Sequence, residues 1–159
     1  MQRILRDIEF ANSTDRLIIK SKTLSVLRKY GQKKGTGESG GILLGYVYRD
    51  HTEVVKVTTP SRFDSFGPRF FIRSRISAQA QIDKAWKKSG GTLIYLGEWH
   101  THSETNPKLS VVDREMIIKS LRETRMEIDF LYLIIVGHNC GYWVGKQIRK
   151  RLSELKRIN

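Results

Sequence analysis

Cysteine is almost absent from this sequence of 159 residues, which contains only Cys140. A single cysteine excludes an intramolecular disulfide and any zinc or iron–sulfur site that needs several thiolate ligands. It is also typical of proteins that remain in a reducing compartment, so we expect a cytoplasmic protein. A metal site in this chain would have to be built from histidine, aspartate and glutamate side chains.

Long apolar runs and proline are also scarce. No stretch approaches the ~20 apolar residues that a membrane-spanning helix needs. Segment 1–10 carries charges where a secretion signal would carry its apolar core, so we expect neither secretion nor insertion into a membrane. Only 3 prolines, with 39% hydrophobic and 28% charged residues, are typical of a folded chain. The length predicts one domain over residues 1–159.

Acidic residues are few relative to basic ones. The chain has 29 lysines and arginines against 16 aspartates and glutamates, which gives a formal net charge of +13. Such an excess favours an anionic partner, which could be a nucleic acid, an anionic membrane surface or an acidic protein. Charge alone does not distinguish among these partners.

Periodicity and turn residues predict an α/β (α+β) domain with a mixed, mainly antiparallel sheet flanked by helices. Strands are expected at residues 8–11, 17–20, 41–48, 53–59, 70–73, 92–99, 130–136 and 142–148. Helices are expected at residues 22–32, 75–88 and 110–123, and the basic segment 149–159 is expected to form a further short helix. The apolar run 92–99 indicates a central strand that is buried on both faces.

Two histidines lie at the end of that apolar run. His100 and His102 are two residues apart, and the period of a strand directs both imidazoles to the same side. Asp113 follows in the first turn of the next expected helix, and the loop between is long enough to bring its carboxylate to the pair. Two imidazoles and one carboxylate that leave a fourth position open for water are typical of a catalytic zinc site.

A water molecule in that fourth position needs a base to accept its proton. Glu38 is a candidate because it follows a glycine-rich loop and lies at the start of strand 41–48. Glu98 competes for the role, but its spacing of two residues from His100 makes it a same-face neighbour that would support the ligand. The residues alone leave the choice between the two glutamates open.

Each of these residues also has a purely structural interpretation. Histidines at a strand end are often hydrogen-bonded residues, and Glu38 could be a solvated loop acid. Ser110 and Asp113 match the capping box of a helix N-terminus. The conjunction of all these residues at these offsets favours a site, because chance rarely produces it in one chain.

The complete pattern is His100-Thr101-His102, then Ser110 and Asp113, with Glu38 upstream beside a strand. This pattern resembles the signature of the JAMM (JAB1/MPN+) metalloproteases. The order of the expected strands and helices is similar as well, and the resemblance covers residues 17–148. It therefore implies a single MPN/JAB-like domain.

The resemblance also implies a role for each residue of the pattern. His100, His102 and Asp113 would bind Zn²⁺. Glu38 would be the general base and then the general acid, and Ser110 would help to hold the oxyanion. The reaction so implied is hydrolysis of a peptide or isopeptide bond by attack of a zinc-bound water.

Within the family, the compact length and the stretch 97–102 resemble the bacterial JAB peptidases found with ubiquitin-like conjugation enzymes, including those of CBASS anti-phage operons. The implied function is removal of a ubiquitin-like protein, or of a similarly conjugated nucleotidyltransferase, from its target. An E1/E2-like conjugating enzyme would be functionally linked. We expect the loops 59–71 and 103–109 to line a groove for the extended tail of the substrate.

Two other functions remain open at this stage. The charge of +13 is compatible with a nucleic-acid-binding or DNA-repair-associated JAB-like protein. Those repair relatives usually carry His-Asn-His-Pro where this chain has His-Thr-His-Ser at residues 100–103, which counts against that branch. A catalytically silent MPN scaffold is disfavoured because every expected catalytic position is filled.

Overall fold

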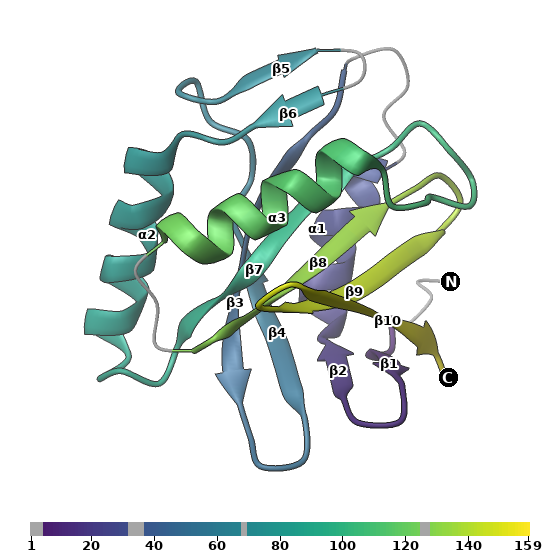
Figure 1. Ribbon diagram of the computed structural model, residues 1–159, viewed down its shortest axis with the longest axis horizontal. Coiled ribbons are helices and arrows are strands. Elements are labelled where there is room, and N and C mark those ends of the chain that lie inside the picture. The colour runs from purple at the N-terminus through teal and green to yellow at the C-terminus, as the bar shows by residue number, and fades with distance from the viewer. Residues whose placement is uncertain (1–4, 32–36, 68–69, 125–127) are drawn as a thin grey trace.

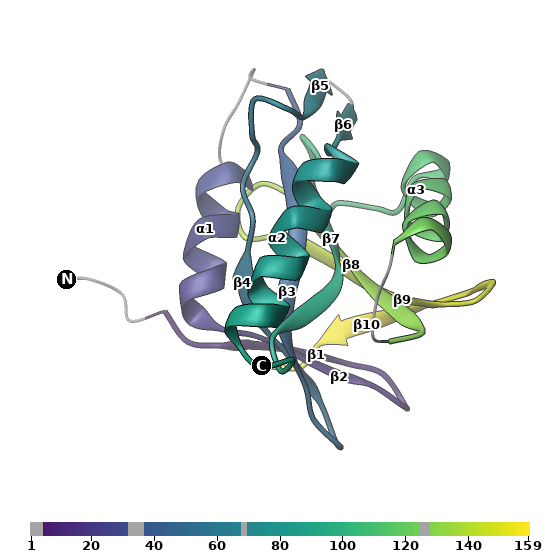
Figure 2. The ribbon, with the colours of Figure 1, turned by 90° about the vertical axis from the view of Figure 1, so that its left-hand side faces the viewer.

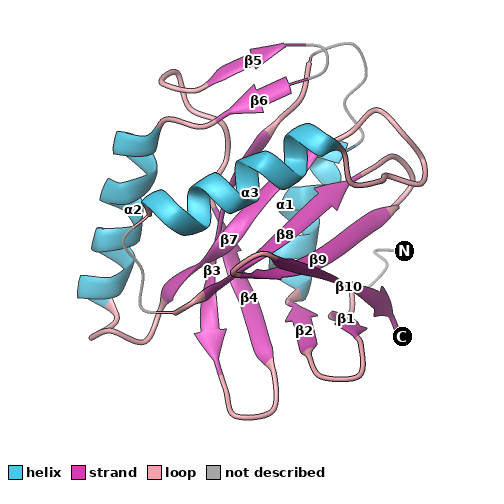
Figure 3. Cartoon of the chain, in the orientation of Figure 1, coloured by secondary structure: helices cyan, strands magenta, loops and turns pink. Residues whose placement is uncertain are grey.

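The computed structural model describes residues 5–31, 37–67, 70–124 and 128–159. The helices are α1 (Ser21–Gly31), α2 (Arg75–Lys88) and α3 (Val111–Glu123) (Figure 1). The strands are β1 (Ile8–Ala11), β2 (Arg16–Ile19), β3 (Gly40–Val47), β4 (Thr52–Val57), β5 (Ser65–Gly67), β6 (Phe70–Ile72), β7 (Ile94–Thr101), β8 (Phe130–Val136), β9 (Tyr142–Ile148) and β10 (Arg151–Arg157) (Figure 3). No helix in the described part of the chain has the length and apolarity needed to cross a bilayer.

Eight of the strands form a closed barrel in the order β1, β10, β9, β8, β7, β3, β4 and β2. The pairs β2–β4 and β7–β8 are parallel, whereas the other pairs are antiparallel. The expected mixed, mainly antiparallel sheet with helices beside it is therefore confirmed. That expectation did not include the closure of the sheet into a barrel. The short strands β5 and β6 form a separate antiparallel pair.

Closure of the barrel depends on the basic segment 149–159, which we expected to be a short helix. That expectation is wrong, because residues 151–157 form strand β10, which pairs with β9 on one side and β1 on the other. Arg149 reverses the chain with a φ of 50°, and Leu155 is buried in the core. Pairing along both edges satisfies the backbone polar groups of β10, and this tertiary gain overrides the modest helix propensity of its side chains.

Apolar side chains form two clusters separated by the sheet. One cluster fills the barrel and includes Leu17, Trp99 and, from α1, Leu24. The other lies on the outer face beneath α2 and α3 and includes Tyr95 and Ile117. Figure 2 shows α1 on one side of β3, β7 and β8, and α3 on the other. All eight residues of β7 are buried, which confirms the expectation of a central strand buried on both faces.

The remaining elements agree closely with the sequence. Helix α2 has the expected bounds, and six of the expected strands pair with their neighbours in the chain as the hairpins β1–β2, β3–β4 and β8–β9. Helix α1 starts at Ser21, whereas its expected last residue, Gln32, lies outside the described residues. Strand β5 occupies part of segment 60–69, where we expected a loop, and residues 68 and 69 of that segment also lie outside the described part.

Candidate metal centre

Strand β7 delivers both histidines to one face of the sheet. His100 lies in register with Gly40 of β3 and Ile135 of β8, so its backbone is held on both sides. His102 follows the end of the strand, and its N–H donates to the carbonyl of Val136 at 3.0 Å. The centroids of the two imidazoles are 5.1 Å apart, as the spacing of two residues in a strand predicts.

Helix α3 brings Asp113 to the histidines. Asp113 Oδ1 lies 2.7 Å from His100 Nε2, and its Oδ2 lies 3.3 Å from His102 Nε2. The capping box is also present. The Ser110 hydroxyl oxygen accepts from the Asp113 N–H at 3.1 Å, and Asp113 Oδ2 accepts from the Ser110 N–H at 2.8 Å. The capping interpretation and the site interpretation of Asp113 are therefore compatible, because one carboxylate makes both sets of contacts.

The surroundings of Asp113 favour its ionised form. Burial alone would raise the pKa of this carboxyl, but the contacts with His100 and His102 and the Ser110 N–H hold it far below its usual range. The converse applies to His102, where burial opposes the charge but contact with Asp113 raises the pKa above its ordinary value. The site thus places a buried carboxylate against two imidazoles, and these opposite charges stabilise one another.

The donor atoms of these three residues fit a metal ion. One ligand atom from each of His100, His102 and Asp113 lies within 4.8 Å of the others, and this is the one such group of histidine, cysteine or acidic side chains among the described residues. Both ring nitrogens of His100 are buried without a well-aligned hydrogen bond to any described group, although Nε2 lies 2.7 Å from Asp113. Buried polar atoms normally have partners, and a divalent ion between two nitrogens and one oxygen would supply one.

Glu38 lies in the same cleft as the candidate metal ligands His100, His102 and Asp113, which we call the metal-binding group. The cleft has a volume of about 740 Å³ and is lined by Glu38, Phe71, Ile72, His100, His102, Ser103, Glu104, Ser110, Val112, Asp113 and Met116. Burial raises the pKa of the Glu38 carboxyl, although the positive potential of the two histidines opposes the rise. A half-buried carboxyl with a raised pKa is suited to accept and then return a proton.

Ser110 lines the cleft from the N-terminus of α3. Its hydroxyl oxygen accepts the capping hydrogen bond from Asp113, which leaves the hydroxyl hydrogen able to donate. Ser110 therefore presents a hydrogen-bond donor at the edge of the group formed by His100, His102 and Asp113.

Glu98, the competing glutamate, is engaged elsewhere. Its carboxylate lies 2.6 Å from Arg73 Nε and accepts from the Tyr95 hydroxyl at 2.5 Å. Burial raises the pKa of Glu98, while the Arg73 guanidinium opposes the rise. Glu98 does not line the cleft, so of the two glutamates only Glu38 faces the metal-binding group.

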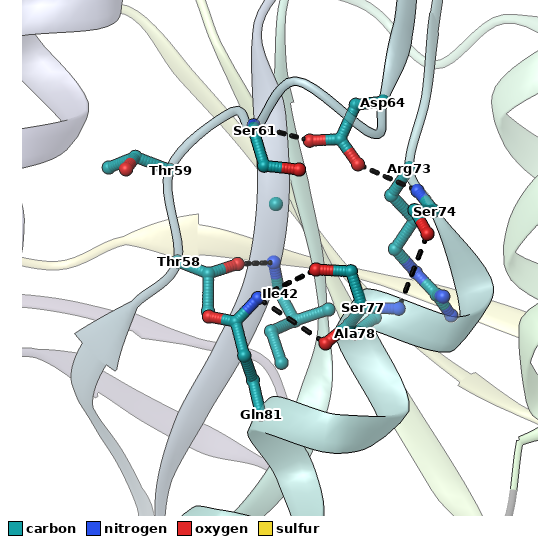
Figure 4. A pocket seen from close by; sticks show the side chains of 11 residues that line it. Ile42, Thr58, Thr59, Ser61, Asp64, Arg73, Ser74, Ser77, Ala78 and Gln81 are labelled. Carbon is teal, nitrogen blue, oxygen red and sulfur yellow. Dashed lines mark hydrogen bonds between the residues drawn. The ribbon is translucent and has the colours of Figure 1, made fainter.

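The β5–β6 hairpin overlaps the segment 59–71 that we expected to line the groove, and it has a second role that the sequence did not indicate, because it helps to hold Glu38. The Glu38 N–H donates to the carbonyl of Gly67 in β5 at 2.9 Å. Asp64 closes the base of the hairpin, since its carboxylate accepts from the N–H groups of Ser61 at 2.7 Å and Ser74 at 2.6 Å (Figure 4). The sequence contains a local signal for this turn, because Ser61-x-x-Asp64 is a turn pattern and Ser74 is the N-cap of α2.

Comparisons with known proteins agree with this geometry. The family model described as prokaryotic homologs of the JAB domain matches residues 20–150. A Vibrio cholerae protein named CD-NTase/cGAS isopeptidase is 31% identical over 98% of this chain and 99% of its own length. A Pseudomonas aeruginosa protein of the same name is 35% identical over 76% of each chain. A solution structure of a Desulfitobacterium hafniense protein has a TM-score of 0.62 at 18% identity, covers 86% of this chain and 87% of that one, and bears on the fold alone.

Proposed function

This chain belongs to the prokaryotic homologs of the JAB domain, and on that basis we propose that it is a zinc-dependent isopeptidase of CBASS anti-phage defence. One observation carries the proposal. The group formed by His100, His102 and Asp113 opens into the same cleft as Glu38, a half-buried carboxyl with a raised pKa. The residues that we propose as ligands, base and oxyanion donor all line this one cleft, which supports the proposal because hydrolysis of an amide needs the three functions together.

The relatives' name suggests the substrate. They are named for a CD-NTase, and we infer that this chain releases a CD-NTase, joined through its C-terminus, from its target protein. A ubiquitin-like protein with a similar C-terminal tail is the other substrate of this class. In either case an E1/E2-like enzyme would form the bond that this chain hydrolyses.

In the proposed reaction each residue has a defined task. His100, His102 and Asp113 hold the zinc ion, which when bound supplies the Lewis acidity that activates water and polarises the scissile carbonyl. Glu38 accepts a proton from the attacking water as its oxygen bonds to the carbonyl carbon. When the C–N bond breaks, Glu38 returns that proton to the departing amine, so the carboxylate is regenerated. Ser110 donates to the carbonyl oxygen as its negative charge develops, an interaction typically worth ~3 to 4 kcal/mol.

The surface beside the cleft suits an extended peptide. A second hollow lies next to the cleft and shares with it Phe71, Ile72, Val112 and Met116. Ile72 and Val112 are exposed and line both hollows, so they offer apolar contact area to a docking peptide. We infer that the tail preceding the scissile bond lies here beside strand β6, where backbone hydrogen bonds could extend the β5–β6 pair. Of the two loops expected to line the groove, 59–71 contributes Phe71 and 103–109 contributes Ser103 and Glu104.

The test uses a CD-NTase joined through its C-terminal carboxyl to a lysine of a second protein. We expect the zinc-loaded protein to release the CD-NTase with an intact C-terminus, as measured by mass spectrometry. A chelated sample should be inactive and should recover activity when zinc is restored. Cleavage that survives chelation, or cleavage inside the CD-NTase, would contradict the proposal.

A further inference from the structure

The residue between the two histidines makes two contacts with the segment that carries Glu38. Thr101 Oγ1 accepts from the N–H of Ser39 at 2.9 Å, and the Thr101 N–H donates to the carbonyl of Ser39 at 2.9 Å. Thr101 is buried. The hydroxyl of one residue of β7 thus fixes the peptide group that follows Glu38.

The peptide group before Glu38 is fixed from a different element. The Glu38 N–H donates to Gly67 in β5, so Glu38 is held between two anchors, one on each side along the chain. Residue 37 has a φ of 76°, and the ladder of β3 begins only at Gly40. Glu38 therefore lies outside the regular ladder of β3, and the hydrogen bonds of its neighbouring peptide groups to Gly67 and Thr101 hold it in place.

Thr101 does not itself face the cleft. Strand alternation directs its side chain to the opposite face from those of His100 and His102, and it is absent from the residues that line the cleft. Whatever Thr101 contributes to the reaction must therefore pass through the residues it holds.

We propose that Thr101 is a positioning residue for Glu38: its hydroxyl keeps the base at a fixed place relative to the two histidines on the same strand. This inference rests on the proposed function. The two histidines and Glu38 then keep a fixed relative position, because segment 100–102 carries both histidines and also binds the backbone of Ser39 next to Glu38. A displacement of about 1 Å in a reacting group can cost ~10²-fold in rate, so such an anchor matters for catalysis.

The test compares Thr101→Val with Thr101→Ser. Valine has the shape of threonine but no acceptor, so we expect kcat to fall by about 10- to 100-fold with little change in KM and unchanged zinc content. Serine restores the acceptor and should recover most of kcat. Thr58→Val is the matched control, because Thr58 Oγ1 accepts from the Ile42 N–H at 2.9 Å on the other side of β3. The control should leave kcat within about 2-fold, since its effect is confined to strand packing.

A double-mutant cycle tests whether Thr101 acts through Glu38. In a Glu38→Ala background, Thr101→Val should cause no further loss of the residual activity. An equal loss in both backgrounds, a loss of zinc from Thr101→Val, or a kcat equal to that of the wild type would overturn the inference.

A second measurement does not depend on hydrolysis. Amide hydrogen exchange at Ser39, followed by NMR, should be at least 10-fold faster in Thr101→Val than in Thr101→Ser. Equal protection in the two variants would overturn the inference even if the substrate were misassigned. Failure of the wild-type protein to cleave any conjugate, combined with the expected exchange difference, would instead contradict only the proposed function.

Discussion

Asp113 uses its two carboxylate oxygens for two purposes. Oδ1 lies against His100, whereas Oδ2 accepts the backbone hydrogen bond that starts α3 and also lies near His102. The N-terminus of a helix favours negative charge, so α3 itself helps to keep this buried carboxylate ionised. The start of the helix and the metal-binding group are therefore one local structure.

Replacing Asp113 by Ala is expected to abolish stoichiometric zinc binding, because it removes the single carboxylate of the metal-binding group. The same change deletes half of the capping box, which should lower the free energy of unfolding by about 1 kcal/mol. Metal analysis after dialysis and denaturant unfolding measure the two effects. Asp113→Asn keeps an acceptor for the Ser110 N–H, so it should lose zinc but less stability. Full zinc content in both variants would refute the assignment of this ligand.

Glu38 is expected to be required for hydrolysis but not for metal binding. Glu38→Gln preserves the shape of the side chain and removes its ability to accept a proton, so kcat should fall by about 10² to 10⁴-fold. Steady-state kinetics and metal analysis of the same sample provide the measurement. Retained turnover at full zinc content would transfer the role of base to another group, and parallel loss of zinc would show that Glu38 is a ligand.

At the scale of the elements, the β5–β6 hairpin (Ser65–Gly67 and Phe70–Ile72) supports the site from outside the barrel. Asp64 joins the two chain segments at the open end of the hairpin, and the carbonyl of Gly67 at the end of β5 accepts from the Glu38 N–H. Phe71 packs so closely over Gly40 that a β-carbon at position 40 would collide with its ring. The hairpin is thus tied to the start of β3 by a backbone hydrogen bond and by an aromatic contact.

Asp64→Ala should loosen the hairpin while leaving the zinc ligands in place. The change leaves the N–H groups of Ser61 and Ser74 without their acceptor, which costs ~1 to 3 kcal/mol for each buried group, less for partly exposed ones. We expect lower kcat, unchanged zinc content and faster amide exchange at Glu38. Asp83→Ala is the matched control, since Asp83 accepts an exposed contact from Gln79 on α2, far from the hairpin in sequence. Equal activities of the two variants would show that the hairpin does not support the base.

At the scale of the whole molecule, the net charge of +13 is not explained by the metal-binding group, which consists of two histidines and one aspartate. Five exposed basic residues gather on the turn before β10 and on the strand itself: Arg149, Lys150, Arg151, Lys156 and Arg157. Because β10 is a strand and not a helix, these side chains project from a strand of the closed barrel that pairs with β1 and β9. An acidic substrate would be attracted by such a surface before it docks at the cleft.

The cleavage efficiency, kcat/KM, is expected to fall several-fold as salt rises from low to physiological ionic strength, whereas kcat should stay constant. The reason is that salt shortens the Debye length to ~8 Å and so weakens charge-assisted encounter. Replacing the five basic residues by Gln should flatten this dependence. Salt-insensitive cleavage that is unchanged in the variant would defeat the steering hypothesis. Loss of tight, steeply salt-dependent DNA or RNA binding in the variant would instead assign the charge to nucleic acid.

Local patterns in the sequence were enough to predict the elements of this protein that form between residues close together in the chain. The hairpins, the bounds of α2 and the burial of β7 follow from residues that are neighbours in the chain, because side-chain period and turn chemistry act over a few residues. The proximity of His100, His102 and Asp113 was predictable for the same reason, since one strand, one short loop and one helix cap connect them.

Only the tertiary structure decided the features that depend on contacts distant in sequence. The segment of β10 is short and rich in charged residues, and its strand conformation is set by pairing with β1 and β9. The direction of the Glu98 side chain was likewise decided by a distant residue, because the Arg73 guanidinium contacts the Glu98 carboxylate outside the cleft. The Arg73–Glu98 contact joins residues 25 positions apart, and the β1–β10 pairing joins the two ends of the chain. The energy of these contacts comes from burial and pairing that no local pattern of side chains encodes.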